Sequence, residues 1–269
     1  EGVRCSAAAC ILLGVLTALL LTAILLPLTR TLLVLMETPP EILDGAEDFI
    51  FIIFAGLVIF LLLYLQNCLV RALGDSMTPT ILLAITLAVN AALEPIAILV
   101  LDLGIPGAAG ATVLSQAIGA LLFYIYIRQR IPTLCPAWQD WKLDAALLAA
   151  HLRMGLPMGL QSSVIALGAI ILQVALNNLG ALPVAAYAAT QKIDAVAVMP
   201  MLSFGYAMAA YTAQNYGAQQ YARIRAGVHA CLKMSVAFAV AIGILLIVFG
   251  TYLLALFVGA DAQGADEVI

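Results

Sequence analysis

Two polar side chains and a proline stand together inside one long apolar segment, at a spacing that suits an ion. Asn90 and Glu94 are four residues apart, so both lie on the same face if the segment is helical. Pro95 follows directly and has no backbone N–H for the carbonyl of Ala91, so it should kink the helix. A carboxylate beside a freed carbonyl oxygen predicts a site for a proton or a Na⁺ ion.

The next apolar segment opens with a run of small residues, which lets two helices approach each other closely. The run covers residues 107–112 and reads Gly-Ala-Ala-Gly-Ala-Thr. We expect the hydroxyls of Thr112 and Ser115 to reach the same pocket as Asn90 and Glu94. The alternative is structural: Glu94 is then a carboxylic acid, kept neutral by desolvation, that holds two helices together.

Three further polar side chains lie together in a later apolar segment, namely Gln191, Lys192 and Asp194. An ionisable group at the centre of a membrane span costs about 2.5–3.5 kcal/mol, so it is a candidate for function. Lys192 and Asp194 are two residues apart and do not share a helix face. Each needs its own partner or a water-filled cavity, and an ion pair with another helix is the alternative. With Gln161, which could also join two helices, these residues are candidates for a substrate cavity.

Seven long apolar stretches must position these side chains. Each has roughly 20 residues or more, enough to cross a hydrocarbon core of about 30 Å. Hydrophobic residues make up 65% of the chain and charged residues 10%, and the mean hydropathy is +1.12. Because lipid offers the backbone no hydrogen bonds, each stretch must be a helix, and we predict an all-α polytopic membrane protein. The predicted spans are 5–36, 44–70, 78–102, 107–128, 153–179, 183–212 and 229–258.

Basic residues cluster at every second junction between these spans and so distinguish the two sides of the membrane. Nine of the eleven Lys and Arg residues lie at these junctions, and the other junctions are acidic. The nine are Arg4, Arg71, Arg128, Arg130, Lys142, Arg153, Arg223, Arg225 and Lys233. The positive-inside rule places them in the cytoplasm. We therefore expect a multi-pass protein of the plasma (cytoplasmic) membrane with a cytoplasmic N-terminus and an extracytoplasmic C-terminus.

Two parts of the chain resemble each other. Residues 2–36 and 227–261 each open on Gly-Val, continue as a small-residue helix and end at an acidic junction. Both copies run in the same direction, and such parallel repeats are typical of transporters built from two related halves. We expect a fragment in which residues 1–130 end one half, residues 131–152 form a cytoplasmic linker, and residues 153–269 begin the next half.

Several metal-binding and catalytic patterns are missing from the sequence. The five cysteines form no C-x-x-C pair, so we expect free thiols and no zinc site. The sequence has no G-x-x-x-x-G-K-[ST] run for a nucleotide, and neither G-x-S-x-G nor H-E-x-x-H. We therefore expect no enzyme, no cofactor, and no metal ion other than Na⁺ at Glu94.

A series of motifs resembles the multidrug and toxic compound extrusion (MATE) transporters, in the same order and over almost the whole chain. Asn90 to Pro95 is similar to their fifth-helix N-x-x-x-[DE]-P pattern, and Gly104 to Thr112 is similar to their G-x-x-G-A-A-x-A-T run. The other matching motifs are Arg71-Ala72-Leu73-Gly74-Asp75 with Pro79, Gly155-Leu156-Pro157, and Gln214-Asn215-Tyr216-Gly217-Ala218.

The resemblance implies twelve helices in two six-helix bundles. Residues 1–130 would hold helices three to six, and residues 153–269 helices seven to nine. It also implies a secondary active transporter that exports organic cations or other amphiphilic compounds in exchange for H⁺ or Na⁺. Members with a cation site in the first bundle use residues that correspond to Asn90, Glu94 and Thr112. Glu stands here where many members have Asp, and the fifth predicted span has no carboxylate for a second site.

Other interpretations fit the residues less well. A relative that flips lipid-linked oligosaccharides needs several cavity-facing Arg and Lys residues for pyrophosphate, and only Lys192 lies deep in a span. A seven-helix receptor or retinal protein, with Lys192 as attachment site and Asp194 as counter-ion, needs an extracellular N-terminus. A membrane-embedded enzyme needs a paired His or Ser–His motif. We expect the lipid bilayer and a small amphiphilic molecule as partners, no nucleic acid, and a monomer.

Overall fold

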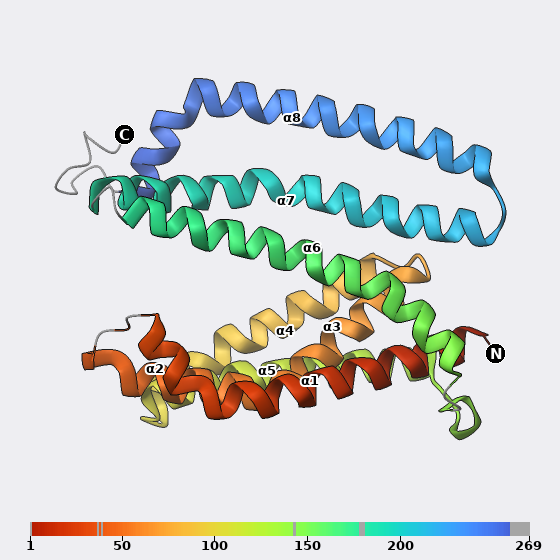
Figure 1. The fold of residues 1–269 in the computed structure, drawn as a ribbon, viewed down its shortest axis with the longest axis horizontal. Coiled ribbons are helices and arrows are strands. Elements are labelled where there is room, and N and C mark those ends of the chain that lie inside the picture. The colour runs from red at the N-terminus through yellow and green to blue at the C-terminus, as the bar shows by residue number, and fades with distance from the viewer. Residues whose placement is uncertain (1, 37, 39, 142–143, 178–180, 259–269) are drawn as a thin grey trace. The chain divides into compact units, whose positions relative to one another are not determined.

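The computed structural model describes residues 2–36, 38, 40–141, 144–177 and 181–258, and these ranges contain helices but no strand. The chain divides into two compact units, Glu1–Met154 and Gly155–Ile269. Figure 1 labels the helices of both units, and each unit is described by itself. The prediction of an all-α protein is confirmed.

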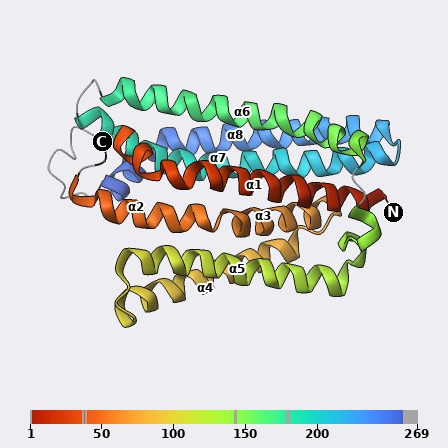
Figure 2. The same cartoon turned by 60° about the horizontal axis from the view of Figure 1, so that its bottom comes forward.

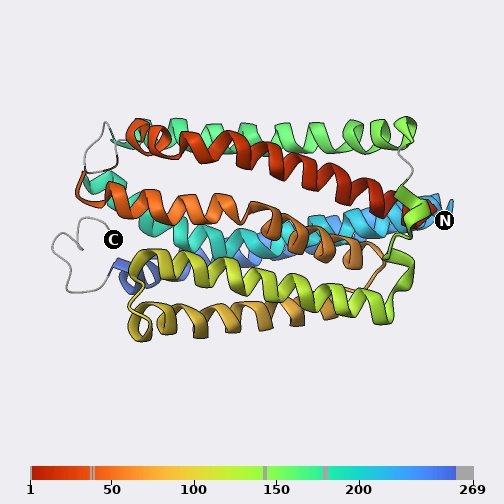
Figure 3. The same cartoon turned by 90° about the horizontal axis from the view of Figure 1, so that it is seen from below.

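The first unit is a bundle in which one helix contacts most of the others. Its helices are α1 (Gly2–Leu35), α2 (Pro40–Ala55), α3 (Leu57–Ala72), α4 (Met77–Pro95), η1 (Ile96–Val100) and α5 (Gly104–Arg130). α5 packs against α2, α3 and α4, and α1 packs against α2 and α3. Figure 3 shows this order across the unit, from red α1 through orange α2 and α3 to yellow-green α5 and golden α4. α5 therefore connects α4, which carries Asn90 and Glu94 of the predicted ion site, to the rest of the unit.

Two long helices run side by side in the second unit, α7 (Ala181–Gly217) and α8 (Tyr221–Val258). Figure 2 shows both in blue shades, together with green α6 (Ala145–Asn177). The rings of Phe204 and Phe238 meet edge to face with their centroids 6.1 Å apart. Tyr211 donates a hydrogen bond to the carbonyl of Arg223 near the turn between the two helices. One side of α7 is thus occupied by α8.

Six of the described helices are long and apolar enough to cross a membrane, and α2 with α3 makes a seventh span if the two count as one. This length and composition confirm a multi-pass membrane protein. The predicted span 44–70 was wrong as a single helix, because α2 and α3 meet at Gly56 with a bend of 50°. A Cβ at Gly56 would lie 2.7 Å from Cγ2 of Val113, so glycine allows the break to approach α5 closely.

The segment after α5 folds back onto the first unit. Its first turn, η2 (Pro132–Leu134), contacts α1 and α5. Leu134 is only 4% exposed and belongs to an apolar cluster with Leu63, Val70, Phe123 and Ile127. Burial of this leucine provides a hydrophobic contribution that keeps the segment against α3 and α5.

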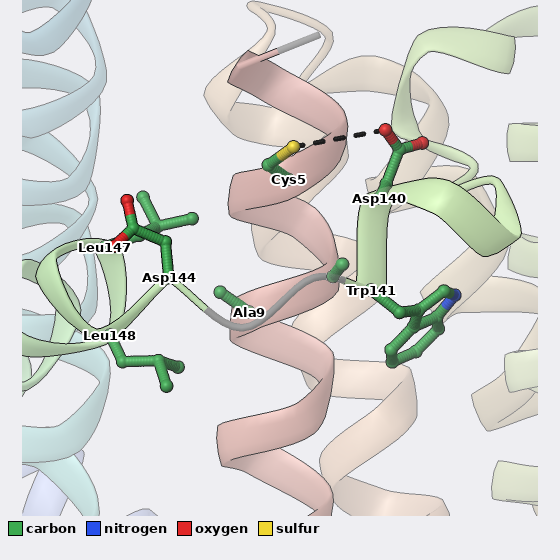
Figure 4. Close-up of a pocket in the computed structure, with 8 residues that line it drawn as sticks. Cys5, Ala9, Asp140, Trp141, Asp144, Leu147 and Leu148 are labelled. Atoms are coloured by element: carbon green, nitrogen blue, oxygen red, sulfur yellow. Dashed lines mark hydrogen bonds between the residues drawn. The ribbon is translucent and has the colours of Figure 1, made fainter.

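A second turn of this segment, η3 (Trp138–Trp141), lies against the start of α1. Figure 4 shows a small pocket there, where the Cys5 thiol donates to Oδ1 of Asp140 at 3.9 Å. Lys142, part of the predicted basic loop, lies outside the described residues. The last part of the predicted linker is already helical, because α6 begins at Ala145.

The carboxylate of Asp75 links the turn between α3 and α4 to α5 through hydrogen bonds. Asp75 accepts a hydrogen bond from the Thr78 N–H at 3.0 Å and another from the Tyr126 hydroxyl at 2.7 Å. Gly74 precedes it with a φ of +95°, which a residue without a Cβ adopts at little cost. These hydrogen bonds, chiefly those from Thr78, lower the pKa of Asp75 below its usual value.

Small residues set the distance between α4 and α5. A Cβ at Gly119 would overlap the side chain of Thr86, which is itself only 3% exposed. The Thr86 hydroxyl donates to the carbonyl of Leu82, so the polar atom of this buried residue has a partner. Close approach at Gly119 therefore depends on the absence of a side chain, and Gly119 lies outside the run 107–112 from which the close approach of the two helices was predicted.

We expect Gly119→Ala to lower the thermal midpoint of the purified protein in detergent relative to Gly110→Ala. Both changes add a methyl group to α5 and gain up to about 1 kcal/mol of helix propensity. A Cβ at Gly110 meets nothing within 4 Å, whereas a Cβ at Gly119 meets Thr86. Overpacking of this kind costs about 1–3 kcal/mol. Equal midpoints for the two variants would contradict the close contact.

We expect Tyr126→Phe to cost about 1 kcal/mol of stability at neutral pH, a fall in midpoint of about 2–4 °C. Tyr124→Phe is the matched control, because Tyr124 is 48% exposed on the same helix. The lowered pKa of Asp75 means that its contribution is present above about pH 4 and is lost as pH falls through the folded-state value. The effect of Tyr126→Phe should therefore shrink below about pH 4. An effect that stays undiminished after Asp75 has become protonated would contradict a bond to the carboxylate.

Candidate functional site

The helix that carries the predicted ion site changes its winding at Pro95. α4 ends at this residue and continues as a π-helix, η1, which the sequence did not predict. The N–H groups of Leu101 and Leu103 bond the carbonyls of Ile96 and Ala97, at 3.0 and 3.1 Å. Proline supplies no N–H to the helix. In the wider turn that follows, the N–H groups bond carbonyls five and six residues back instead of four. Such π-turns often lie at functional sites.

Asn90 and Thr112 meet between α4 and α5, as expected. The Asn90 amide nitrogen donates to the Thr112 hydroxyl at 3.4 Å. That hydroxyl in turn donates to the carbonyl of Ala108 at 3.0 Å. Both side chains are partly buried. The bond uses the Asn90 amide nitrogen and leaves its side-chain carbonyl oxygen as an acceptor.

Glu94 lies one turn further along α4. It is partly buried and lines a pocket that opens to the surface, together with Ala91, Pro95, Ile98 and Leu99. Among the described residues, its carboxylate has neither a hydrogen bond nor an ion pair. Asn90 and Thr112 do not line this pocket. The structure thus brings two members of the predicted trio together and places the third beside them, at the mouth of an otherwise apolar pocket.

A second pocket lies on another side of the π-turn. It is lined by Leu93, Ile96, Ala97, Leu101, Leu103, Pro106, Gly107, Gly110, Ala111 and Leu114. None of these side chains carries a charge or a hydrogen-bonding group. Residues of the π-turn therefore line two pockets. One contains the carboxylate of Glu94, and the other is apolar.

The substrate-cavity candidates all belong to the second unit. Gln161 is exposed on α6, and Gln191, Lys192 and Asp194 are exposed on α7. Gln191 donates a hydrogen bond to the hydroxyl of Tyr187, one turn earlier. Tyr187 was not among the predicted site residues, although its spacing of four residues from Gln191 is the signal for such a contact. Neither Lys192 nor Asp194 has an ion pair within the described part of the chain.

No group of three or more His, Cys, Asp or Glu side chains is placed to hold a metal ion within the residues that the structure describes. The oxygen atoms near Glu94 are one carboxylate, one amide carbonyl and one hydroxyl. Such a mixed, weakly charged set suits a monovalent ion or a proton more than a divalent cation, which prefers several carboxylates.

Comparison with known proteins agrees with these features. A family model described as MatE matches residues 1–96 and 157–265. The chain is 31% identical over 243 residues to the probable multidrug resistance protein YpnP of Bacillus subtilis (strain 168), covering 89% of this chain and 54% of that protein. It is 25% identical over 268 residues to the probable multidrug resistance protein NorM of Thermotoga maritima, covering 96% and 56%. The chain thus spans just over half the length of these relatives.

Solved structures show the same fold. A multidrug resistance MATE family transporter of the MOP superfamily, in an outward-facing conformation, matches with a TM-score of 0.87 at 21% identity, over 99% of this chain and 63% of that one. A MOP superfamily transporter from Pyrococcus furiosus matches with the same score and identity, over 98% and 63%. At this identity the agreement shows a shared fold. The chain belongs to the MatE family, the multidrug and toxic compound extrusion transporters that its motifs resemble.

Proposed function

We propose that this chain acts in a secondary active transporter that exports organic cations or other amphiphilic compounds in exchange for H⁺ or Na⁺. Its family and the names of its relatives, which are called multidrug resistance proteins, support this proposal. The observation that carries it is Glu94. A carboxylate that lies in an apolar span beside a π-turn, and that has no partner among the described residues, can bind and release an ion.

Glu94 alternates between an ion-bound form and a free carboxylate in this proposal. The bound form has no net charge and is compatible with the apolar wall made by Ala91, Ile98 and Leu99. The free carboxylate is costly at this depth, so release of the ion favours an arrangement in which water reaches it. The difference in solvation free energy between the two forms is what couples the ion to the conformation of the span.

The neighbouring Asn90–Thr112 pair would supply further oxygen atoms to a Na⁺ ion. Its hydroxyl and amide carbonyl lie one turn from Glu94 on the same side of α4. An ion shared by all three groups would draw Glu94 towards α5 and change the π-turn that follows Pro95. A proton would need the carboxylate alone, and the pair would then only position the two helices.

The rest of the transporter follows the family plan. Rocking of two bundles would expose a central cavity to alternate sides of the membrane. Gln161, Gln191, Lys192 and Asp194 are the candidates for its lining in the second half. The basic junctions would face the cytoplasm of a cell whose plasma membrane holds the protein as a monomer, with the N-terminus inside and the C-terminus outside.

A flippase for lipid-linked oligosaccharides ranks second. Pyrophosphate requires several cationic side chains at depth, and Arg is the residue best suited to it. Arg30, near one end of α1, forms ion pairs with Asp44 and Glu47 instead. Lys192 is the single cation left deep within the described spans. One cation favours an exporter of positively charged or neutral compounds over a pyrophosphate carrier.

We expect Glu94→Gln to slow ethidium efflux from cells that express the protein by at least about tenfold, because an amide can neither bind a proton nor neutralise Na⁺. Glu94→Asp should keep part of the activity, since it retains the carboxylate. Asp102→Asn, which removes an exposed carboxylate near the end of the same span, is the control and should leave efflux unchanged. Efflux is measured before and after each of the H⁺ and Na⁺ gradients is dissipated. If Glu94→Gln still pumps with the same ion dependence, the coupling role of Glu94 is wrong.

Replacing Thr112 distinguishes the two ions. Thr112→Val keeps the shape and removes the hydroxyl that Asn90 contacts, whereas Thr112→Ser keeps the hydroxyl. With Na⁺ as the coupling ion, we expect the Na⁺ concentration for half-maximal efflux to rise about tenfold in Thr112→Val, roughly the loss of one ligand worth 1.4 kcal/mol, and to change little in Thr112→Ser. With H⁺, both variants should keep the pH profile. A Ser variant as impaired as the Val variant would show that the hydroxyl is not a ligand.

A further inference from the structure

The segment that follows α5 turns back at one end of the first unit and presents an indole ring there. Trp138, the first residue of η3, is 93% exposed, more than any other large apolar side chain of the described residues. Figure 3 shows this segment in green beside the start of α1, at the end of the unit where the N-terminus lies. α5 is long enough to cross a membrane and ends at Arg130, so the ring lies close to the level at which this span leaves the hydrocarbon.

The backbone on both sides of Trp138 is fixed to the helices of the first unit. Before the ring, the Leu134 side chain is buried in the apolar cluster of α3 and α5. After it, the Asp140 N–H donates to the carbonyl of Ala137 at 2.9 Å, and the Ala137 N–H donates to Oδ2 of Asp140 at 2.7 Å. Oδ1 of the same carboxylate accepts a hydrogen bond from the thiol of Cys5 on α1. The exposed position of the ring is therefore fixed by contacts of its neighbours in the chain.

Arginine side chains gather at the same end of the unit. Arg128 and Arg130 are exposed in the last turn of α5, Arg71 lies in the last turn of α3, and Arg4 lies near the start of α1. The ends of α3 and α5 are neighbours, because both contribute side chains to the same apolar cluster. None of the four arginines forms an ion pair with another residue that the structure describes. This end of the unit can therefore accept an anionic partner.

Three carboxylates at this end are already engaged in hydrogen bonds within the unit. Asp75 and Asp140 each accept two hydrogen bonds. Asp144 accepts one from the Ala146 N–H at 3.0 Å, at the start of α6. Such donors stabilise a carboxylate inside the protein. The four arginines outnumber these three carboxylates and remain available to an anion from outside.

The chemistry of these side chains selects the kind of partner that fits them. Arginine is the side chain best suited to phosphate, because its guanidinium offers paired donors. Tryptophan prefers the boundary between headgroups and hydrocarbon, where its ring meets apolar chains and its N–H stays hydrated. An anionic phospholipid presents a phosphate directly beside apolar chains and so satisfies both. In the orientation proposed above, this end faces the cytoplasmic leaflet, whose anionic lipids attract Lys and Arg side chains.

We infer that Arg128, Arg130 and Trp138 form a binding site for the headgroup of an anionic phospholipid. The two arginines bind the phosphate, and the indole ring lies beside the glycerol end of the acyl chains. Leu134 and Asp140 position the ring, because they fix its segment to α3, α5 and α1. The inference depends neither on the exported compound nor on the coupling ion, so it stands or falls separately from the proposed transport.

Native mass spectrometry of the purified full-length protein, titrated with phosphatidylglycerol or phosphatidylcholine, tests the arginines. We expect the first lipid to bind at least about fivefold more tightly when it is phosphatidylglycerol, and the double variant Arg128→Gln with Arg130→Gln to weaken its binding about tenfold. The double variant Arg223→Gln with Arg225→Gln is the matched control. It removes two exposed arginines at the same spacing, at the start of α8 and far from any tryptophan in the sequence, and should change binding less than about twofold. Equal losses in the two double variants, or equal affinities for the two lipids, would overturn the assignment.

The ring is tested by its depth in the membrane. The protein is reconstituted into vesicles of brominated phosphatidylglycerol, in which bromine quenches a nearby indole, and the fluorescence of Trp138 is the difference between the unaltered protein and Trp138→Phe. Bromine near the glycerol should quench this difference at least about twofold more than bromine at the chain ends. Trp141, which is less exposed and lines the pocket beside α1, is the control, and its difference signal should be quenched less. No quenching of Trp138 in either vesicle, or stronger quenching from the chain ends, would overturn its place in the site.

Two further measurements keep the result unambiguous. Gel filtration and the thermal midpoint of each variant are compared with those of the unaltered protein, so that loss of the fold is recognised. Inorganic phosphate is added in competition with phosphatidylglycerol and should leave the lipid bound, because it offers nothing for the ring. Complete displacement by inorganic phosphate would show that the arginines serve a soluble anion and that the lipid assignment is wrong.

Discussion

A backbone in lipid must bond its own N–H and C=O groups, and Pro95, near the end of the Met77–Val100 span, has no N–H to donate. The chain continues as a π-turn over Ile96–Val100, in which Leu101 and Leu103 find partners five and six residues back. This π-turn, a form that is rare and often lies at functional sites, directly follows Glu94 and Pro95. The pockets on its two sides leave space for a change in winding.

The rest of the interface between α4 and α5 is closely packed. Gly119 accepts the buried Thr86 side chain without space for even a methyl group, and beyond it Phe123 and Ile127 belong to the apolar cluster that Leu134 completes. This half is closely packed, and close-packed interiors transmit displacement rather than absorb it. Asn90 and Thr112 lie between this packed half and the π-turn.

The sequence predicted the class of fold and the order of the spans, because long apolar runs in lipid have one solution, the helix. It predicted the Asn90–Thr112 contact from small residues that allow close approach. It missed the break at Gly56, since hydropathy continues across a bend, and it started α6 and α8 too late, at 153 and 229 instead of Ala145 and Tyr221. The first turns of α8 contain Arg223 and Arg225, and the first turns of α6 are apolar but are followed by His151 and Arg153, which marked the expected start of the span. It also missed the π-turn after Pro95 and the pocket that Glu94 lines with residues of that same segment, because apolar periodicity does not distinguish a π-turn from an α-turn.

Among the described residues, one charged side chain near a helix end has ion-pair partners, whereas those deeper in the spans have none. Arg30, near the end of α1, has Asp44 and Glu47 as partners on the neighbouring helix. Glu94 and Asp194, deeper in their spans, have no such partner among the described residues. An ionisable group at depth is costly unless it is paired. In the proposed transporter, a bound ion offsets this cost at Glu94, and an ion pair with another helix is the structural alternative for Asp194.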